Sequence, residues 1–336
     1  MILEYSGRAI VFMSLPFHPY WELAFGSWAI FMVLITIGAL TLAAGKILDN
    51  MEIGHNVMHG QWDWLRDPRI RANTWEWDNA CPSEQWRNFH NVIHHDWTNV
   101  LGKDRDLGFG ALRVHALQRW RPSRLGQPLS SAMLALFFEW GLASHGVQLG
   151  RYKHGQMPGA ELVRRLAQIT SKVSRQLLKD YLCWPLLAGP LFLQVCAANL
   201  AANLIRNVWV YAIIICGHFP DSASVFTKQE VENESRGQWY LRQVLGTCNI
   251  RGSARFHFWT GNLCHQIEHH LYPDLPSNRY SEIAPRIEAL CARYAVPYNT
   301  GSLVTQFFSA QGKIVRLSLP RRVDHTQSVE PFKPAA

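Results

Sequence analysis

Residues 23–45, LAFGSWAIFMVLITIGALTLAAG, form a run of 23 residues that contains no Asp, Glu, Lys or Arg. A helix of about 20 apolar residues is long enough to cross the ~30 Å hydrocarbon core of a bilayer. A buried helix of a soluble core is usually shorter than this run. The run therefore predicts a membrane-spanning helix in an integral membrane protein.

A second uncharged region covers residues 181–205 and continues as an apolar stretch to residue 219. It is too long for one span and indicates a hairpin of two helices, in which Pro185 and Pro190 are tolerated as kinks. Residues 9–21 are apolar but too short to cross alone, so we expect them to belong to a span that precedes residue 23. The predicted spans are residues 8–22, 24–48, 181–197 and 199–217.

The charge of the polar segments predicts their side of the membrane. Residues 151–180 contain seven Lys or Arg and two acidic residues, and basic loops prefer the cytoplasm. Residues 130–149 are apolar but interrupted by Glu139 and His145, so we expect an interfacial helix there rather than a span. With this topology all polar segments lie on one, cytosolic side.

The predicted fold is an all-α integral membrane protein with about four transmembrane helices and a cytosolic helical cap. It is expected to be a multi-pass protein of the cell membrane, with groups scattered through the sequence meeting on the cytosolic surface. We expect one membrane domain over residues 1–320, a cap made of residues 50–180 and 218–310, and a loose C-terminal tail at residues 321–336.

Composition disfavours several other classes of protein. The 336 residues carry 33 Lys and Arg against 25 Asp and Glu, a formal net charge of +8, and only 17% of them are charged. These values do not fit a disordered tail or a coiled coil. The seven Cys form no Cys-x-x-Cys pair, which disfavours a disulfide scaffold, a structural zinc site and an iron–sulfur cluster. No stacking-aromatic or helix-turn-helix pattern accompanies the positive charge, so no nucleic-acid partner is expected.

Three histidine clusters dominate the polar segments: His55-Asn-Val-Met-His59, His90-Asn-Val-Ile-His94-His95 and His265-Gln-Ile-Glu-His269-His270. They contain eight of the 15 His in the chain. Two side chains four residues apart share one face of a helix, so these clusters could enclose two metal ions between helices. Imidazole binds iron, zinc, copper and nickel, which leaves the metal open. One such pair could be purely structural, but three clusters on one face indicate a metal centre.

Two acidic residues near the clusters are interpreted as supporting groups. Glu52 precedes the first cluster and Glu268 lies inside the third, and each is expected to orient a ligand imidazole. The zinc-protease pattern His-Glu-x-x-His is absent because residues 56 and 91 are Asn. A membrane zinc hydrolase is therefore disfavoured.

The histidine clusters and their flanks resemble the membrane fatty acid desaturase family. Within it, they are most similar to bacterial stearoyl-CoA 9-desaturases of the actinobacterial type. The resemblance covers residues 27–320. The residues that carry it are Glu52-Ile-Gly-His-Asn-Val-Met-His-Gly-Gln-Trp-Asp-Trp64, His94-His-Asp-Trp-Thr-Asn99 and Gly261-Asn-Leu-Cys-His-Gln-Ile-Glu-His-His-Leu-Tyr-Pro-Asp-Leu-Pro-Ser-Asn278.

The resemblance implies a di-iron centre held almost wholly by histidine. His218, in Cys216-Gly-His-Phe-Pro220, looks like the family's additional ligand outside the three clusters. Glu52, Asn99, Gln266 and Glu268 are expected to support the ligands. The implied catalytic and metal-binding residues are His55, His59, His90, His94, His95, His218, His269 and His270.

The third cluster departs from the simplest family pattern, which has His or Gln, two residues, and then His-His. This pattern places Gln266 at the ligand position and leaves His265 one residue early. Helix geometry puts His265 on the face of His269 and Gln266 on that of His270, so either could reach a metal. His265 is kept as a candidate ligand, and His257 is interpreted as a bystander.

The resemblance also implies a reaction. Two iron ions (Fe2+/Fe3+) use O2 to take two hydrogens from adjacent carbons of a long-chain acyl group, leaving a cis double bond, with stearoyl-CoA or palmitoyl-CoA desaturated at position 9. An apolar tunnel would hold the acyl chain. Electrons are expected from a separate reductase, because the sequence has no Gly-x-Gly-x-x-Gly fingerprint, haem module or cysteine cluster. The resemblance implies that this reductase uses NADPH.

Other readings stay open from the sequence alone. The same scaffold supports hydroxylation, epoxidation or ketolation of an acyl chain, and product analysis separates these reactions. A membrane metal carrier is a more distant alternative, because it would place its ligands inside the spans. The basic stretch at residues 151–179, with Arg113, Arg119 and Arg121, could bind coenzyme A phosphates, or it could simply face anionic lipid.

Overall fold

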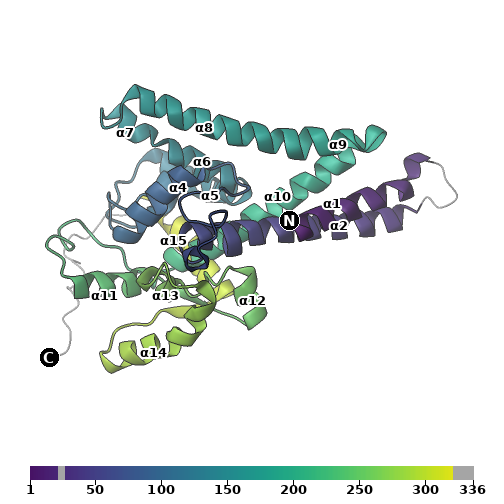
Figure 1. The fold of residues 1–336 in the computed structure, drawn as a ribbon. Helices are drawn as coiled ribbons and strands as arrows, with labels where there is room; N and C mark the ends of the chain where they lie inside the picture. Colours follow the sequence, from purple (N-terminus) through teal and green to yellow (C-terminus); the bar gives the residue numbers. More distant parts are fainter. Residues whose placement is uncertain (22–26, 321–336) are drawn as a thin grey trace. The chain divides into compact units, whose positions relative to one another are not determined.

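The computed structural model describes residues 1–21 and 27–320, which are mostly helical with one short two-stranded sheet (Figure 1). Residues 22–26 and the predicted tail at 321–336 lie outside the described residues. The chain divides into two compact units. The first contains Met1–Ile53, Glu76–Pro82 and Leu136–Val210, and the second contains Gly54–Trp75, Ser83–Ala135 and the residues from Tyr211 onward.

The first unit begins with two closely packed antiparallel helices, α1 (Ile2–Ser14) and α2 (Trp28–Leu48). Glycine permits the close approach, because a Cβ atom on Gly7 would lie 2.5 Å from the backbone nitrogen of Leu42. Small residues let helices approach in this way, which is common in membrane helix pairs. The pair is visible at the N-terminal end of the chain in Figure 1.

Helix α2 continues beyond the predicted end of its span. A π-helical segment, Asp49–His55, follows it and leads into the single turn α3 (Asn56–Met58). In the described part of the chain, Trp28–Met58 and Gly189–His218 are the helices long and apolar enough to cross a membrane. Two candidate spans are thus present, and the remaining two spans stay a prediction.

The second pair of long helices has its turn at a different place from the predicted one. Helix α8 (Gly159–Leu178) continues through a π-helical segment, Lys179–Cys183, into α9 (Trp184–Leu186). The chain then reverses and forms α10 (Phe192–His218), as Figure 1 shows. Much of the basic stretch that we expected to be a loop is therefore helical.

The predicted break between residues 197 and 199 falls inside the continuous helix α10. The reversal lies instead next to Gly189, whose φ of +55° suits a residue without a side chain. Pro190 follows in the first turn of the next helical segment, where proline is well tolerated because its missing N–H needs no partner. Gly-Pro is thus the turn itself, whereas the sequence analysis treated the proline as a kink within a span.

The remaining elements are shorter. The expected interfacial segment forms two helices that meet at Phe137, and its position at the interface stays a prediction. The other helices are α4 (Ser83–Arg87), α5 (Gln127–Leu136), α6 (Phe138–Val147), α7 (Leu149–Lys153), α11 (Arg236–Gly246), α12 (Ala254–Trp259), α13 (Gln266–Leu271), α14 (Tyr280–Arg293) and α15 (Leu303–Ser318). A further π-helical segment is Asn88–His94, and short 3₁₀ turns are Leu15–Phe17, Pro19–Trp21, Asp63–Leu65, Leu107–Gly110, Pro122–Gly126, Gly189–Leu191 and Ser277–Arg279.

In the second unit, helices α11, α13 and α14 pack around a small core of Val244, Ile267 and Cys291. Of these three helices, α14 is the longest, with 14 residues. Helix α11 was not predicted, although its capping box, in which the side chains of Ser235 and Gln238 each bond the other's backbone N–H, is a sequence signal for a helix start.

The sheet is also a departure from the all-α prediction. Strand β1 (Asn249–Arg251) pairs in parallel with β2 (Thr300–Ser302) in the second unit. Each strand has only three residues, which is too few to show an alternating pattern of apolar and polar side chains. Only the folded chain brings these two segments together.

A buried ion cluster joins the helices of the first unit. The Asp180 carboxylate is fully buried and accepts hydrogen bonds from Arg8 in α1, at 2.8 Å, and from Lys46 in α2, at 2.9 Å. Asn203 in α10 donates to the same carboxylate. One acidic side chain thus compensates two buried cations from different helices. Without it, Arg8 would keep only Glu4 and Lys46 only Asp78, and both of these carboxylates are partly exposed.

We predict that Asp180→Ala destabilises the protein by up to about 3–5 kcal/mol, because Arg8 and Lys46 would lose the fully buried carboxylate that they share and keep only partly exposed partners. Thermal unfolding of the detergent-purified chain measures the change. The control is Glu161→Ala, which removes partly exposed pairs with Arg164 and Arg165 and should cost less than about 1 kcal/mol. Equal melting temperatures for the two variants would contradict the role given to Asp180.

Candidate metal centre

Eight of the nine candidate ligand histidines meet in the second unit. They come from four parts of the chain that are far apart in sequence. The first pair lies at the end of the π-helical segment after α2 and just beyond α3, the next three at the end of the π-helical segment after α4, one at the end of α10 and two in α13. In chain order these residues are His55, His59, His90, His94, His95, His218, His269 and His270.

The eight imidazoles form two connected groups. The first group is His55, His59, His90 and His269, whose ligand nitrogens all lie within 4.8 Å of one another. The second group is His94, His218 and His270, which meets the same limit. His95 forms a similar set with His269 and His270 and so connects the two groups. We call them the four-imidazole group and the three-imidazole group.

Many of the ring nitrogens in this cluster are buried without a hydrogen bond. Among the described residues no partner is found for Nε2 of His59, His90, His269 and His270, for Nδ1 of His218, or for either nitrogen of His95. A buried nitrogen without a partner costs about 1–3 kcal/mol. Seven such atoms in one place are expensive for a purely structural cluster, and bound metal ions would satisfy them. The residues present therefore fit a metal centre.

The opposite nitrogens of several rings are held from outside the cluster. Asp106 lies 2.8 Å from Nδ1 of His90, and Asp104 lies 3.0 Å from Nδ1 of His94. Tyr280 bonds Nδ1 of His269. Further such contacts join His55 to Asn56, and His270 to Gln243 and Thr98.

A hydrogen bond to Nδ1 fixes the orientation of the imidazole and directs Nε2 inward, which is the usual arrangement around a metal. None of these outer hydrogen-bond partners was predicted from the sequence. Their separation from the ligands ranges from one residue to 172, so no fixed spacing could have revealed the set.

Burial keeps most of these imidazoles neutral. It lowers the pKa of His59, His95, His269 and His270 well below its usual value, and neighbouring imidazoles add to the shift. A neutral ring has the lone pair that a metal ion needs. At His94 burial also acts to lower the pKa, but the nearby Asp104 carboxylate outweighs it and the pKa is raised.

Comparison with known proteins decides the family. Residues 26–302 match the sequence profile of the fatty acid desaturase family. The chain belongs to that family. It is also 48% identical over 287 residues to an NADPH-dependent stearoyl-CoA 9-desaturase of Mycobacterium tuberculosis, an alignment that covers 84% of this chain and 67% of the relative.

More distant desaturases align over a similar part of the chain. Fatty acid desaturase 3 of Bos taurus is 28% identical over 294 residues, which cover 84% of this chain and 60% of that protein. The sn-1 linoleoyl-lipid 6-desaturase of Synechocystis is 25% identical over 291 residues, which cover 82% and 79%. The resemblance seen in the sequence is thus confirmed, and the chain is an oxidoreductase of the desaturase family.

Asp104 organises the second histidine cluster of this desaturase. Besides facing His94, its carboxylate accepts hydrogen bonds from the backbone nitrogens of Asn99, at 2.7 Å, and Asp106, at 2.8 Å. Asn99 in turn donates to the backbone carbonyl of Gly246 at the end of α11. It was predicted to support a ligand, and its side chain contacts the carbonyl of His218 rather than an imidazole.

Gln266 contacts a ligand of the desaturase directly. Its Nε2 lies 2.9 Å from Nε2 of His218, so the amide can donate to that ring. The contact depends on Gly217, where an added Cβ atom would lie 2.9 Å from Cγ of Gln266. The two residues next to each other in the family motif thus have different places: Gln266 joins the three-imidazole group, and His265 does not.

His265 and Glu268 make hydrogen bonds with residues outside the eight-histidine cluster. His265 bonds His257 instead, with 2.9 Å between the two nitrogens. Glu268 accepts hydrogen bonds from Asn249 and Tyr298. Glu52 belongs to the first unit, and its supporting role stays a prediction.

The candidate phosphate-binding arginines differ in exposure. Arg113 is 1% exposed, and its guanidinium donates to the backbone carbonyls of Ala116, Gln118 and Leu317. It is therefore a structural residue, and its proposed contact with coenzyme A is wrong. Arg119 and Arg121 are exposed and stay candidates.

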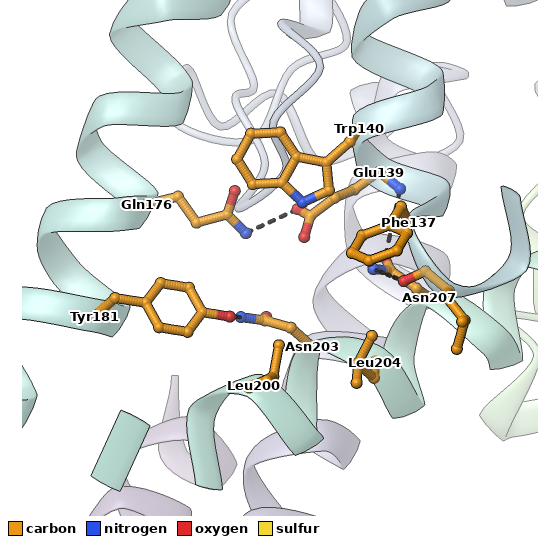
Figure 2. A pocket seen from close by; sticks show the side chains of 10 residues that line it. Phe137, Glu139, Trp140, Gln176, Tyr181, Leu200, Asn203, Leu204 and Asn207 are labelled. Carbon is orange, nitrogen blue, oxygen red and sulfur yellow. Dashed lines mark hydrogen bonds between the residues drawn. The ribbon is translucent and has the colours of Figure 1, made fainter. Parts of the chain in front are cut away.

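A separate pocket lies in the first unit between α6, α8 and α10 (Figure 2). Its volume is about 280 Å³, and its wall combines leucines and aromatic rings with a polar network. In that network Gln176 donates to Glu139, Asn203 donates to Tyr181, and Asn207 donates to a backbone carbonyl. This pocket is not an apolar tunnel, and the predicted acyl tunnel stays a prediction.

We predict that Asp104→Asn weakens metal binding about 10- to 100-fold, because His94 loses the carboxylate that holds its ring. Metal retained per chain, measured by mass spectrometry after equilibration against a chelator, gives the ratio. Asp67→Asn is the matched control, since Asp67 pairs with the exposed Arg69 and should leave metal retention unchanged. Retention in Asp104→Asn equal to that of the control would refute the role of Asp104.

A second prediction concerns the contact between Gln266 and His218. Gly217→Ala should displace the Gln266 side chain and weaken metal binding to a lesser degree, by up to about 10-fold. Gly126→Ala is the control, because nothing lies within 4 Å of its added Cβ atom. The same chelator competition compares them, and Gln266→Ala should match Gly217→Ala if displacement of the amide is the cause.

Proposed function

We propose that this desaturase introduces a cis double bond at position 9 of a long-chain acyl-CoA, with stearoyl-CoA or palmitoyl-CoA as substrate. The observation that carries the proposal is the buried eight-histidine cluster with its unpaired inward nitrogens. The identity of 48% to a protein named as an NADPH-dependent stearoyl-CoA 9-desaturase supports the choice of substrate and position.

Two iron ions are proposed as the bound metals. The four-imidazole group would hold one and the three-imidazole group the other, with His95 between them. Iron suits these neutral nitrogen ligands. Bound iron would supply, with O2, the oxidising power that removal of hydrogen from an unactivated methylene requires. His265 is not proposed as a ligand of this centre, because it bonds His257.

The protein's own residues orient and shield the ligands. Asp104, Asp106 and Tyr280 hold the outer nitrogens of three rings, so the inward nitrogens keep their direction when substrate binds. Trp86 stacks on His90 with 4.3 Å between ring centroids, and it also packs edge-on against His55. Such packing excludes water from this side of the cluster and restrains the rings.

The proposed setting is the cell membrane, with the metal centre on the cytosolic side. His55 and His218 support this, because each lies at or near the end of one of the two long apolar helices. Four spans remain the proposal, with the first two near residues 8–22 and 24–48. The predicted bounds 181–197 and 199–217 are not kept for the second pair, because its turn lies at Gly189 and Gly189–His218 is one apolar helix. The single-domain assignment for residues 1–320 and the cap at 50–180 and 218–310 are likewise proposals.

The electron supply is proposed to be a separate reductase that uses NADPH. The relative's name includes NADPH dependence, and this sequence has no nucleotide-binding fingerprint of its own. Exposed Arg119 and Arg121 are proposed to contact coenzyme A phosphates.

Analysis of fatty acids in a desaturase-deficient host tests the proposal. The host expresses this chain together with a matching reductase, and gas chromatography–mass spectrometry identifies the products. We expect a new monounsaturated acid with its double bond at position 9. His94→Ala/His95→Ala should abolish it, because it removes one ligand of the three-imidazole group and the imidazole that connects the two groups. His154→Ala, at an exposed site, should retain the product at equal expression.

A hydroxy acid in place of the unsaturated product would show a hydroxylase on the same scaffold. No product, despite iron-loaded protein and an active reductase, would overturn the acyl-CoA assignment.

A further inference from the structure

A second group of metal-ligating side chains lies in the same unit as the eight-histidine cluster but shares no residue with it. It consists of His257 in α12, and of Cys264 and His265 just before α13. Their ligand atoms lie within 4.8 Å of one another. Cys264 is fully buried, and the side chain of His265 is 12% exposed.

The spacing of the two imidazoles fits one coordination sphere. Nε2 of His265 lies 2.9 Å from Nδ1 of His257. Two nitrogens bound to the same tetrahedral Zn2+ at 2.0–2.1 Å would be about 3.3 Å apart. A small outward movement of the rings would therefore admit a cation between them.

The hydrogen bond between the two rings does not satisfy both of them. His257 uses Nδ1 in that bond, and its Nε2 is buried with no partner in the described part of the chain. Both tautomers of His257 leave this atom unpaired, either as a donor or as an acceptor. A buried nitrogen without a partner costs free energy, so the contact with His265 does not fully satisfy this ring.

The surroundings of His265 also resemble those of a metal ligand. Its Nδ1 faces Oε2 of Glu268 at 3.7 Å. That carboxylate is itself held by hydrogen bonds from Asn249 and Tyr298. Carboxylates hydrogen-bonded to the outer nitrogen orient histidine ligands in many metal sites; here Glu268 approaches that nitrogen but lies beyond hydrogen-bond distance.

We propose that His257, Cys264 and His265 bind one divalent cation of the zinc class, separate from the eight-histidine cluster. A thiolate with two imidazoles is a typical ligand set for such an ion, and a water molecule would complete a tetrahedral sphere. The thiol gives up its proton to solvent on binding. The ion would join α12 to the start of α13, and α13 carries His269 and His270.

This assignment also accounts for the sequence pattern. His265 stands one residue before the family's ligand position, and the second site gives it a different role. The site differs from the eight-histidine cluster in having a sulfur ligand. Because sulfur has a distinctive spectrum when it binds cobalt, the two sites can be told apart without measuring activity.

Cobalt titration of the purified full-length, iron-loaded protein tests the proposal. Co2+ replaces Zn2+ in such sites, and we expect one equivalent to give a thiolate-to-cobalt charge-transfer band in the near-ultraviolet. Zn2+ should displace it and abolish the band. Cys264→Ser should lack the band, while the control Cys248→Ser, which changes another buried thiol, should keep it.

Metal analysis supplies the second measurement. His257→Ala and Cys264→Ser should each bind zinc at least about 10-fold more weakly than the wild-type protein, with iron content unchanged. His257→Ala keeps the thiol, so it remains informative if Cys264→Ser cannot be purified. No charge-transfer band in the wild-type protein, or a band that persists in Cys264→Ser, would overturn the proposal, and neither result depends on desaturase activity.

Discussion

The burial of eight imidazoles in one cluster is the constraint on which the second unit depends. Seven nitrogens from six of these rings have no hydrogen-bond partner in the described chain, and this state is unfavourable unless an ion occupies the cluster. Side chains outside the cluster therefore fix the rings through contacts with their outer nitrogens. Asp104 shows how closely this support is integrated with the backbone, because the same carboxylate faces His94 and accepts two backbone N–H groups.

Local helix geometry helps to bring these rings together. Two histidine clusters overlap π-helical segments, in which one turn is wider than in an α-helix. His55 ends the segment Asp49–His55, and His90 and His94 lie within Asn88–His94. Such segments occur often at functional sites. The histidines of the second cluster face different groups. His90 and His95 each lie close to His269, whereas His94 belongs to the three-imidazole group.

The first unit, in contrast, buries charged side chains among largely apolar helices. Asp180 pairs with Arg8 and Lys46, and Arg206 pairs with Glu139. Buried ion pairs of this kind add little to the net stability of the fold, but removing one partner of a pair is strongly destabilising. They join α1 and α2 to the π-helical segment Lys179–Cys183, and α6 to α10, whereas the apolar contacts of Val11, Phe31 and Val195 supply burial.

The sequence by itself determined the apolar length of α2, the histidine spacing and the desaturase family, because these are properties of neighbouring residues. It failed where distant segments meet. The turn at Gly189 was misplaced, since a Gly-Pro pair can be a kink or a turn until α8 and α10 pack. Local spacing put His265 with His269, but only the tertiary structure paired it with His257. The supports Gln243 and Tyr280 likewise reach the cluster through folding alone, because contacts across long loops leave no local pattern in the sequence.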